Sequence, residues 1–91
     1  MKGYTPVVCA DGFKMSVQAS TLHYCTPRYN RGPYSAVEVG FPSKAEPLLI
    51  KWAEDRDDLT NTVYGWVPAD VVKRVIAKHG GMVGGQLPPF K

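Results

Sequence analysis

Cysteine and histidine are the side chains in this 91-residue chain with the widest chemical range, and the chain has two of each. In an enzymatic interpretation, Cys25 is a nucleophile and His79 or His23 is its base, because a thiolate forms at neutral pH only beside an imidazole or a cation. Arg28 would then bind an anion. No characteristic motif flanks these residues, and Cys9 and Cys25 have the character of small, buried, reduced side chains. A non-catalytic protein is therefore predicted, with a small Cys/His-dependent enzyme as an alternative.

Metal and cofactor sites are not predicted. The two cysteines and two histidines lack the paired short spacings of structural zinc sites. The acidic run 54–58 has Leu59 and Thr60 where a calcium loop needs oxygen ligands and a glycine, so it is predicted to be an exposed turn. Glu38 lies among apolar neighbours, and we expect it on the wet side of a strand rather than in a catalytic role.

The net charge of +3 and the pI of about 9.0 raise the question of nucleic-acid binding. A duplex binder usually gathers its cations on one face, because affinity grows with the number of phosphates neutralised together. The cations here are dispersed along the chain, so a nucleic-acid-binding accessory protein is the alternative to a protein binder. It requires convergence of seven residues on one surface: Arg28, Arg31, Lys44, Lys51, Lys73, Arg74 and Lys78.

A long loop over residues 20–33 concentrates the side chains best suited to binding another protein. Tyrosine and arginine anchor many interfaces, since they combine a large rigid area with a delocalised cation. The predicted binding residues are Tyr24, Arg28, Tyr29, Arg31 and Tyr34. The alternative is that the tyrosine rings cover the core at a sheet edge, as we expect of Trp52 and Trp66.

The loop must be positioned by regular elements, of which the first is a hairpin. Residues 6–10 form a short apolar run, and Asp11-Gly12 suits a tight two-residue turn. Residues 13–19 then alternate between apolar and polar side chains, which is typical of a strand with one face buried. The side chains predicted to face the core are Phe13, Met15, Val17 and Ala19.

Two further strands and a helix follow the loop. Residues 34–41 predict a strand with Val37, Val39 and Phe41 on one side, whereas residues 44–61 show no clear pattern. Residues 62–67 predict another strand, and Pro68 opens a helix that continues to His79. The apolar positions of this helix recur at helical spacing, and Gly80-Gly81 ends it.

These elements predict an α+β fold in which a small antiparallel sheet of three to four strands packs one face against a C-terminal amphipathic helix. Residues 1–81 are expected to form a single domain and residues 82–91 a Gly/Pro-rich tail that is mobile or laid on the surface. The longest apolar run, Leu48-Leu49-Ile50, is far too short to span a bilayer. No apolar secretory segment follows Met1, so a cytoplasmic location and no membrane partner are predicted.

Several short sequence runs of this chain resemble those of a group of small proteins. The YCxPR run at Tyr24–Arg28, VEVGFPS at Val37–Ser43 and VYGWVP at Val63–Pro68 resemble those of small phage- and prophage-encoded proteins. The resemblance covers residues 13–81 and implies no catalytic or cofactor residues. It implies a protein that acts by binding a host protein or complex, including inhibitors of bacterial defences such as CRISPR immunity.

Overall fold

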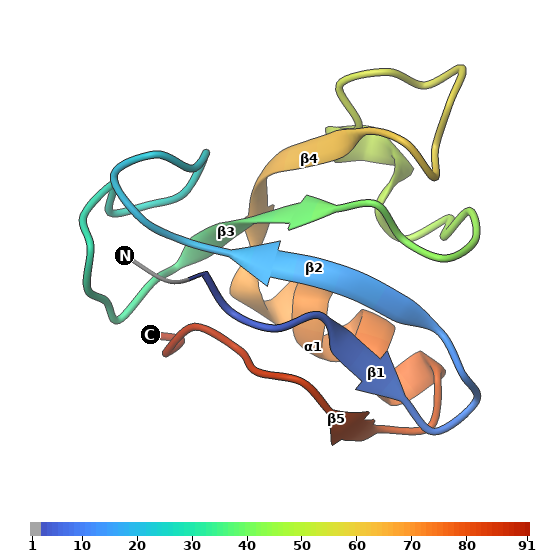
Figure 1. Ribbon diagram of the computed structural model, residues 1–91. Helices are drawn as coiled ribbons and strands as arrows, with labels where there is room; N and C mark the ends of the chain where they lie inside the picture. Colours follow the sequence, from blue (N-terminus) through green and yellow to red (C-terminus); the bar gives the residue numbers. More distant parts are fainter. Residues whose placement is uncertain (1–2) are drawn as a thin grey trace.

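The computed structural model describes residues 3–91, so the first two residues of the predicted 1–81 domain lie outside it. Five strands form one antiparallel sheet in the order β4-β3-β2-β1-β5. Their bounds are β1 Val7–Cys9, β2 Lys14–Gln18, β3 Ala36–Gly40, β4 Val63–Pro68 and β5 Met82–Gly84. A helix, α1, spans Ala69–Lys78 and lies behind the sheet in Figure 1, and a short 3-10 helix, η1, spans Ile50–Trp52. The α+β class is therefore confirmed.

The hairpin of β1 and β2 forms where the sequence predicts it, but its connection is one residue longer. The register pairs Val7 with Met15 and Val8 with Lys14, and the Cys9 N–H donates to the Phe13 carbonyl at 2.9 Å, which leaves residues 10–12 in the turn. Gly12 alone has a positive φ, +94°, whereas a two-residue turn of the expected type needs two such residues. Asp11 instead accepts a hydrogen bond from the Phe13 amide at 2.9 Å through its carboxylate.

The prediction of three to four strands is wrong, because the segment after the helix adds a fifth. β5 pairs with β1 through Val8 opposite Gly84 and Cys9 opposite Met82. Farther along, Phe90 forms an isolated bridge with Tyr34 and packs against the core. The chain following α1 thus returns across the molecule, as the red segment of Figure 1 shows.

The core lies between the sheet and α1 and has the composition that the alternation predicts. Val71, Val72 and Val75 supply the buried face of the helix. From β2 and its flanks come the four predicted inward side chains, all buried: Phe13, Met15, Val17 and Ala19. Both cysteines are free and buried. The acidic run 54–58 is exposed throughout, as predicted.

Candidate binding surface

An exposed cluster of one cation and two aromatic rings lies where the 20–33 loop meets β4. The rings of Tyr24 and Trp66 are stacked, with centroids 4.8 Å apart and planes inclined by 25°. The guanidinium carbon of Arg28 lies 5.5 Å from the centroid of the Tyr24 ring. Such a cation–π contact orients the guanidinium while leaving its N–H groups free to bind a partner. We call these three residues the Arg–Tyr–Trp cluster.

Trp66 points outward because a β-bulge interrupts β4. The register pairs Val39 with Tyr64 but Val37 with Val67, so two residues of β4, Gly65 and Trp66, lie opposite one residue of β3. Tyr64 and Val67 both remain buried, whereas Trp66 is 51 % exposed. Trp66 also has a φ of +52°, a conformation that L side chains rarely adopt. Bulges and strained residues of this kind are concentrated at functional sites, where they redirect a side chain.

The backbone of Tyr24 is fixed to the sheet on both sides. Its N–H donates to the Glu38 carboxylate at 3.2 Å, and its carbonyl accepts a hydrogen bond from the Trp66 N–H at 3.1 Å. Gly65 leaves room for the tyrosine, because a Cβ atom at Gly65 would lie 3.3 Å from the Tyr24 Cβ. Glu38 therefore lies on the partly exposed side of its strand, as predicted, and supports the cluster from there.

The rest of the loop is held by its own polar contacts. Ser20 Oγ lies 2.6 Å from His23 Nδ1, and the Tyr34 hydroxyl donates to the Tyr29 carbonyl at 2.8 Å. At the loop surface, Leu22 and Tyr29 are among the most exposed large apolar side chains of the described residues. The loop therefore presents apolar side chains on an ordered backbone, which lowers the entropic cost of binding.

The five predicted binding residues separate into two groups. Arg28, Tyr29 and Arg31 are exposed, and Tyr24 is partly exposed within the cluster. Tyr34 has no solvent-exposed surface, so the expectation that it presents its ring outward is wrong. Tyr34 precedes β3 and packs its ring in the core. This agrees with the alternative prediction, in which the tyrosine rings cover the core.

Trp66 does not cover the core, which is where the sequence predicts it. Strict alternation along β4 would bury Trp66 together with Tyr64. The signal was the placement of Tyr64 and Val67, two apolar residues separated by two positions that include a glycine. That spacing is the pattern a bulge leaves in a strand with one buried face.

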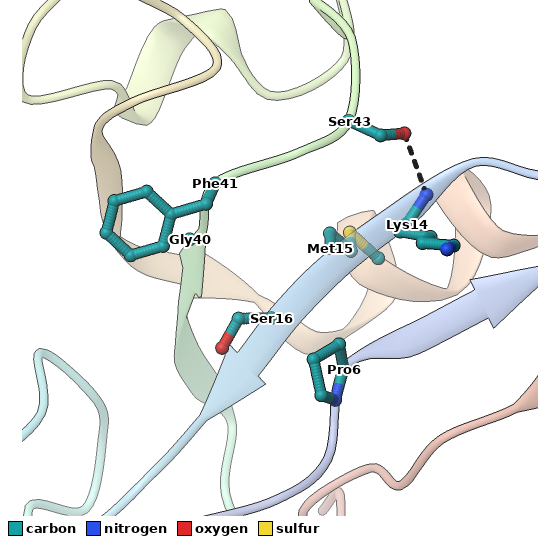
Figure 2. A pocket seen from close by; sticks show the side chains of 7 residues that line it. All are labelled: Pro6, Lys14, Met15, Ser16, Gly40, Phe41 and Ser43. Carbon is teal, nitrogen blue, oxygen red and sulfur yellow. Dashed lines mark hydrogen bonds between the residues drawn. The ribbon is translucent and has the colours of Figure 1, made fainter.

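A second redirected aromatic residue, Phe41, borders a hollow on the same side of the sheet. Alternation predicts it inward with Val37 and Val39, but its φ is +51° and its side chain is 59 % exposed. Figure 2 shows its ring at one side of the hollow and Pro6 at the other, with α1 behind the sheet. The hollow has a volume of about 340 Å³ and is lined by Pro6, Lys14, Met15, Ser16, Gly40, Phe41 and Ser43.

A partly buried cluster of ionisable side chains lies at the C-terminal end of α1. His79 Nδ1 is 2.6 Å from Asp11 Oδ2, and His79 Nε2 is 2.7 Å from Glu46 Oε1. The second oxygen of Glu46 accepts hydrogen bonds from Lys78 Nζ at 2.9 Å and from the Leu48 amide at 2.8 Å. With its charges mutually paired and Glu46 only 1 % exposed, this cluster connects the hairpin turn, the 42–49 segment and the helix.

The pKa values of the two carboxyl groups are both lowered. For Asp11, the hydrogen bond from the Phe13 amide is the main cause of the lowered pKa, followed by the bond to His79. For Glu46, burial is the largest single influence and raises the pKa, but the hydrogen bonds from Leu48, Lys78 and His79 together outweigh it. Both carboxyl groups are therefore ionised at neutral pH and occupy both nitrogens of the imidazole.

The nucleophile hypothesis requires an exposed Cys25 beside a histidine, and the structure does not provide it. Cys25 is 2 % exposed, and its thiol donates to the carbonyl oxygens of Ser20 and Pro27 at 3.3 and 3.4 Å. His79 is bound by two carboxylates instead. Among residues 3–91, no group of three or more His, Cys, Asp and Glu side chains is placed to hold a metal ion.

The cations that a nucleic-acid binder would gather come from several segments, three of them from α1, and five of the seven make contacts of their own. Lys78 pairs with Glu46, and Arg74 pairs with Asp70 at 3.4 Å. Three others lie over different rings, namely Arg28 on Tyr24, Lys51 on Trp52 and Lys73 on Phe90. Within the described part of the chain, no helix has the length and apolar character needed to cross a membrane.

Comparisons with known proteins give no independent assignment. No protein-family model, no curated protein and no solved structure matches this chain.

Proposed function

We propose that this protein acts by non-catalytic binding to another protein, and that the Arg–Tyr–Trp cluster is the centre of the binding surface. The observation that carries the proposal is the outward position of Trp66, which a bulge and a positive φ hold in place. A strained backbone that exposes a large apolar ring opposes stability, and such strain is typical of sites retained for recognition.

The chemistry of the surface fits a protein partner. Tryptophan, tyrosine and arginine are the residues that contribute most to binding energy in protein interfaces. Here Tyr24 contacts both Trp66 and Arg28, and Leu22 and Tyr29 are further exposed apolar side chains of the same loop. The cluster can therefore bury two rings and a stacked guanidinium without first having to order them.

The resemblance to small phage-encoded proteins supports a partner in a bacterial host. Under this proposal the partner is a host protein or complex, and blocking a defence system such as CRISPR immunity is the effect we propose for the binding. Tight binding to a surface is sufficient for such inhibition and needs no chemical step. The Cys25 thiol and the His79 ring are both engaged in hydrogen bonds within the protein, which fits a role without catalysis.

An affinity capture from bacterial host lysate, with and without nuclease, tests this function. The wild-type protein is compared with Trp66→Ala and with Val83→Ala, whose exposed apolar side chain lies on β5 at the opposite edge of the sheet. We expect a nuclease-resistant protein that wild type and Val83→Ala retain and Trp66→Ala loses. Equal retention by all three variants would contradict the proposal.

A second candidate function follows from the same stacked rings. Single-stranded nucleic acids bind to exposed aromatic platforms with a nearby cation, because every base offers a face for stacking. A salt titration with a single-stranded oligonucleotide distinguishes the two functions. Binding that weakens steeply with salt and depends on Trp66 would favour this candidate, whereas the dispersed cations favour the protein partner.

A further inference from the structure

The hollow between Phe41 and Pro6 has a size and a lining suited to a single side chain of a binding partner. Phe41 and Pro6 form its two sides, and Gly40 and Ser16 lie between them (Figure 2). Its volume of about 340 Å³ falls at the lower end of the range found for ligand pockets. A large apolar side chain of a peptide fits a space of that size and lining.

Two features of the backbone keep the hollow open. Phe41 adopts a φ of +51° although Pro42 follows it, and a residue before proline ordinarily takes an extended conformation. Gly40 presents no side chain, and a Cβ atom there would meet only ordinary contacts, at 3.7 Å from Val63 and 3.8 Å from Ser16. Neither crowding nor a positive φ requires glycine at position 40, so the fold itself would accept a side chain there, and the glycine leaves that space to the hollow.

The charge of Lys14 indicates which group should lie next to the apolar side chain in the hollow. Lys14 is the one charged residue in the lining, and it forms no ion pair with any residue that the structure describes. Its own amide is already bound by the Ser43 hydroxyl at 2.9 Å. The free ammonium group is complementary to a carboxylate.

The hollow and the proposed binding surface are both built on β3. Glu38, which holds Tyr24, and Gly40 are two residues apart on β3 and so project from the same face of the strand. Two residues of strand advance by only about 7 Å. A partner segment seated on the Arg–Tyr–Trp cluster therefore reaches the hollow within a few residues.

We infer that the partner of this protein inserts a large apolar side chain between Phe41 and Pro6 and pairs an adjacent carboxylate with Lys14. This inference rests on the proposed function, since it names the chemistry of the segment that the same face of the sheet receives. An acidic peptide segment with an aromatic or branched apolar anchor is the occupant.

A titration of the isolated protein, followed by the backbone amide signals in NMR, tests the inference. The probe is N-acetyl-L-phenylalanine, which carries a ring and a carboxylate, and its matched neutral control is N-acetyl-L-phenylalaninamide. We expect saturable shifts at Gly40, Phe41 and Ser16, with the acid binding about threefold more tightly than the amide at low salt, as an exposed ion pair would give.

Two variants separate the contributions of shape and charge. Gly40→Val fills the hollow and should abolish the shifts of both probes, with the rest of the spectrum showing that the fold is retained. Lys14→Met should leave the amide unaffected and remove the advantage of the acid.

Three outcomes would overturn the inference: no saturable shift at these positions, unchanged binding to Gly40→Val, or an advantage of the acid that persists in Lys14→Met. Because Trp66→Ala should bind the probes like wild type, failure here is distinct from failure of the lysate capture. Shifts confined to residues around Trp66 would reject the hollow while leaving the proposed function standing.

Discussion

His79 Nε2 lies 2.7 Å from the Glu46 carboxylate, and the other ring nitrogen lies 2.6 Å from the Asp11 carboxylate. With both carboxyl groups ionised, each imidazole nitrogen faces a carboxylate oxygen at hydrogen-bond distance. The same ring stacks on Phe13, with centroids 4.1 Å apart and planes inclined by only 9°. The contacts of this one side chain join three segments that are distant in the sequence.

Glu46→Gln tests how far the fold depends on this cluster. The variant keeps the shape of the side chain but removes the buried negative charge between His79 and Lys78. Breaking a buried ion pair on one side leaves its partner uncompensated and costs about 3 kcal/mol. Urea unfolding should show that loss, whereas Asp70→Asn, which breaks the exposed pair with Arg74, should change the free energy of unfolding by less than about 0.5 kcal/mol. Equal effects would contradict the account.

Acid should destabilise the protein through the same two carboxyl groups. The folded-state pKa values of Asp11 and Glu46 lie below their ordinary values of 3.8 and 4.5. The stability that they contribute is therefore fully present above the ordinary values and is lost as the pH falls through the lowered ones. When urea unfolding is measured between pH 7 and pH 2, the midpoint concentration of urea should decrease once the pH is lower than about 4. Glu46→Gln should show a shallower fall, and the same dependence in both proteins would be the contrary result.

The sequence predicted the parts of the fold that follow a regular period. The alternation along 13–19 and the helical spacing after Pro68 each depend on one buried face, so their side chains are placed where predicted. β5 has only three residues and little pattern of its own, and it forms because the helix returns the chain to the edge of β1. The 44–61 segment had no period, and its Glu46 is buried only because the helix end supplies His79 and Lys78.

The candidate site was predicted less well because its geometry depends on departures from regular strands. Trp66 and Phe41 both occupy positions that alternation assigns to the core, and a local positive φ turns each outward. Tyr34 is the opposite case, since its place next to the 20–33 loop suggested exposure, whereas its ring completes the core. Arg28 and Tyr29 were placed correctly at the surface, because the turn residues around them prevent burial of the loop backbone.

Backbone strain at Phe41 predicts an unusual order of stability among its variants. Phe41→Ala and Phe41→Gly remove the same ring, but only glycine adopts a φ of +51° without a steric cost. We expect Phe41→Gly to be more stable than Phe41→Ala by about 1 kcal/mol, the reverse of the usual preference. Thermal unfolding of the two proteins measures this difference. If the alanine variant is as stable as the glycine variant or more so, the strain is not present in solution.

Arg28→Glu combined with Tyr29→Ala should abolish binding to the host partner and leave the fold intact. Arg28 and Tyr29 are both exposed, so their replacement should change the thermal midpoint little. The charge reversal removes the guanidinium from Tyr24 and places a negative charge on the surface. Binding assays with the captured partner should show the loss, and the melting curve serves as the control. Unaltered binding would exclude this part of the loop from the interface.

The affinity of the captured host partner for Trp66→Ala tests the binding surface most directly. A central interface residue of this type contributes at least about 2 kcal/mol, which corresponds to a loss of roughly thirtyfold or more in affinity. We predict that loss for Trp66→Ala in equilibrium titrations of purified components, with Val83→Ala retaining wild-type affinity. Wild-type affinity in Trp66→Ala, or an equal loss in both variants, would contradict the assignment of the Arg–Tyr–Trp cluster as the binding surface.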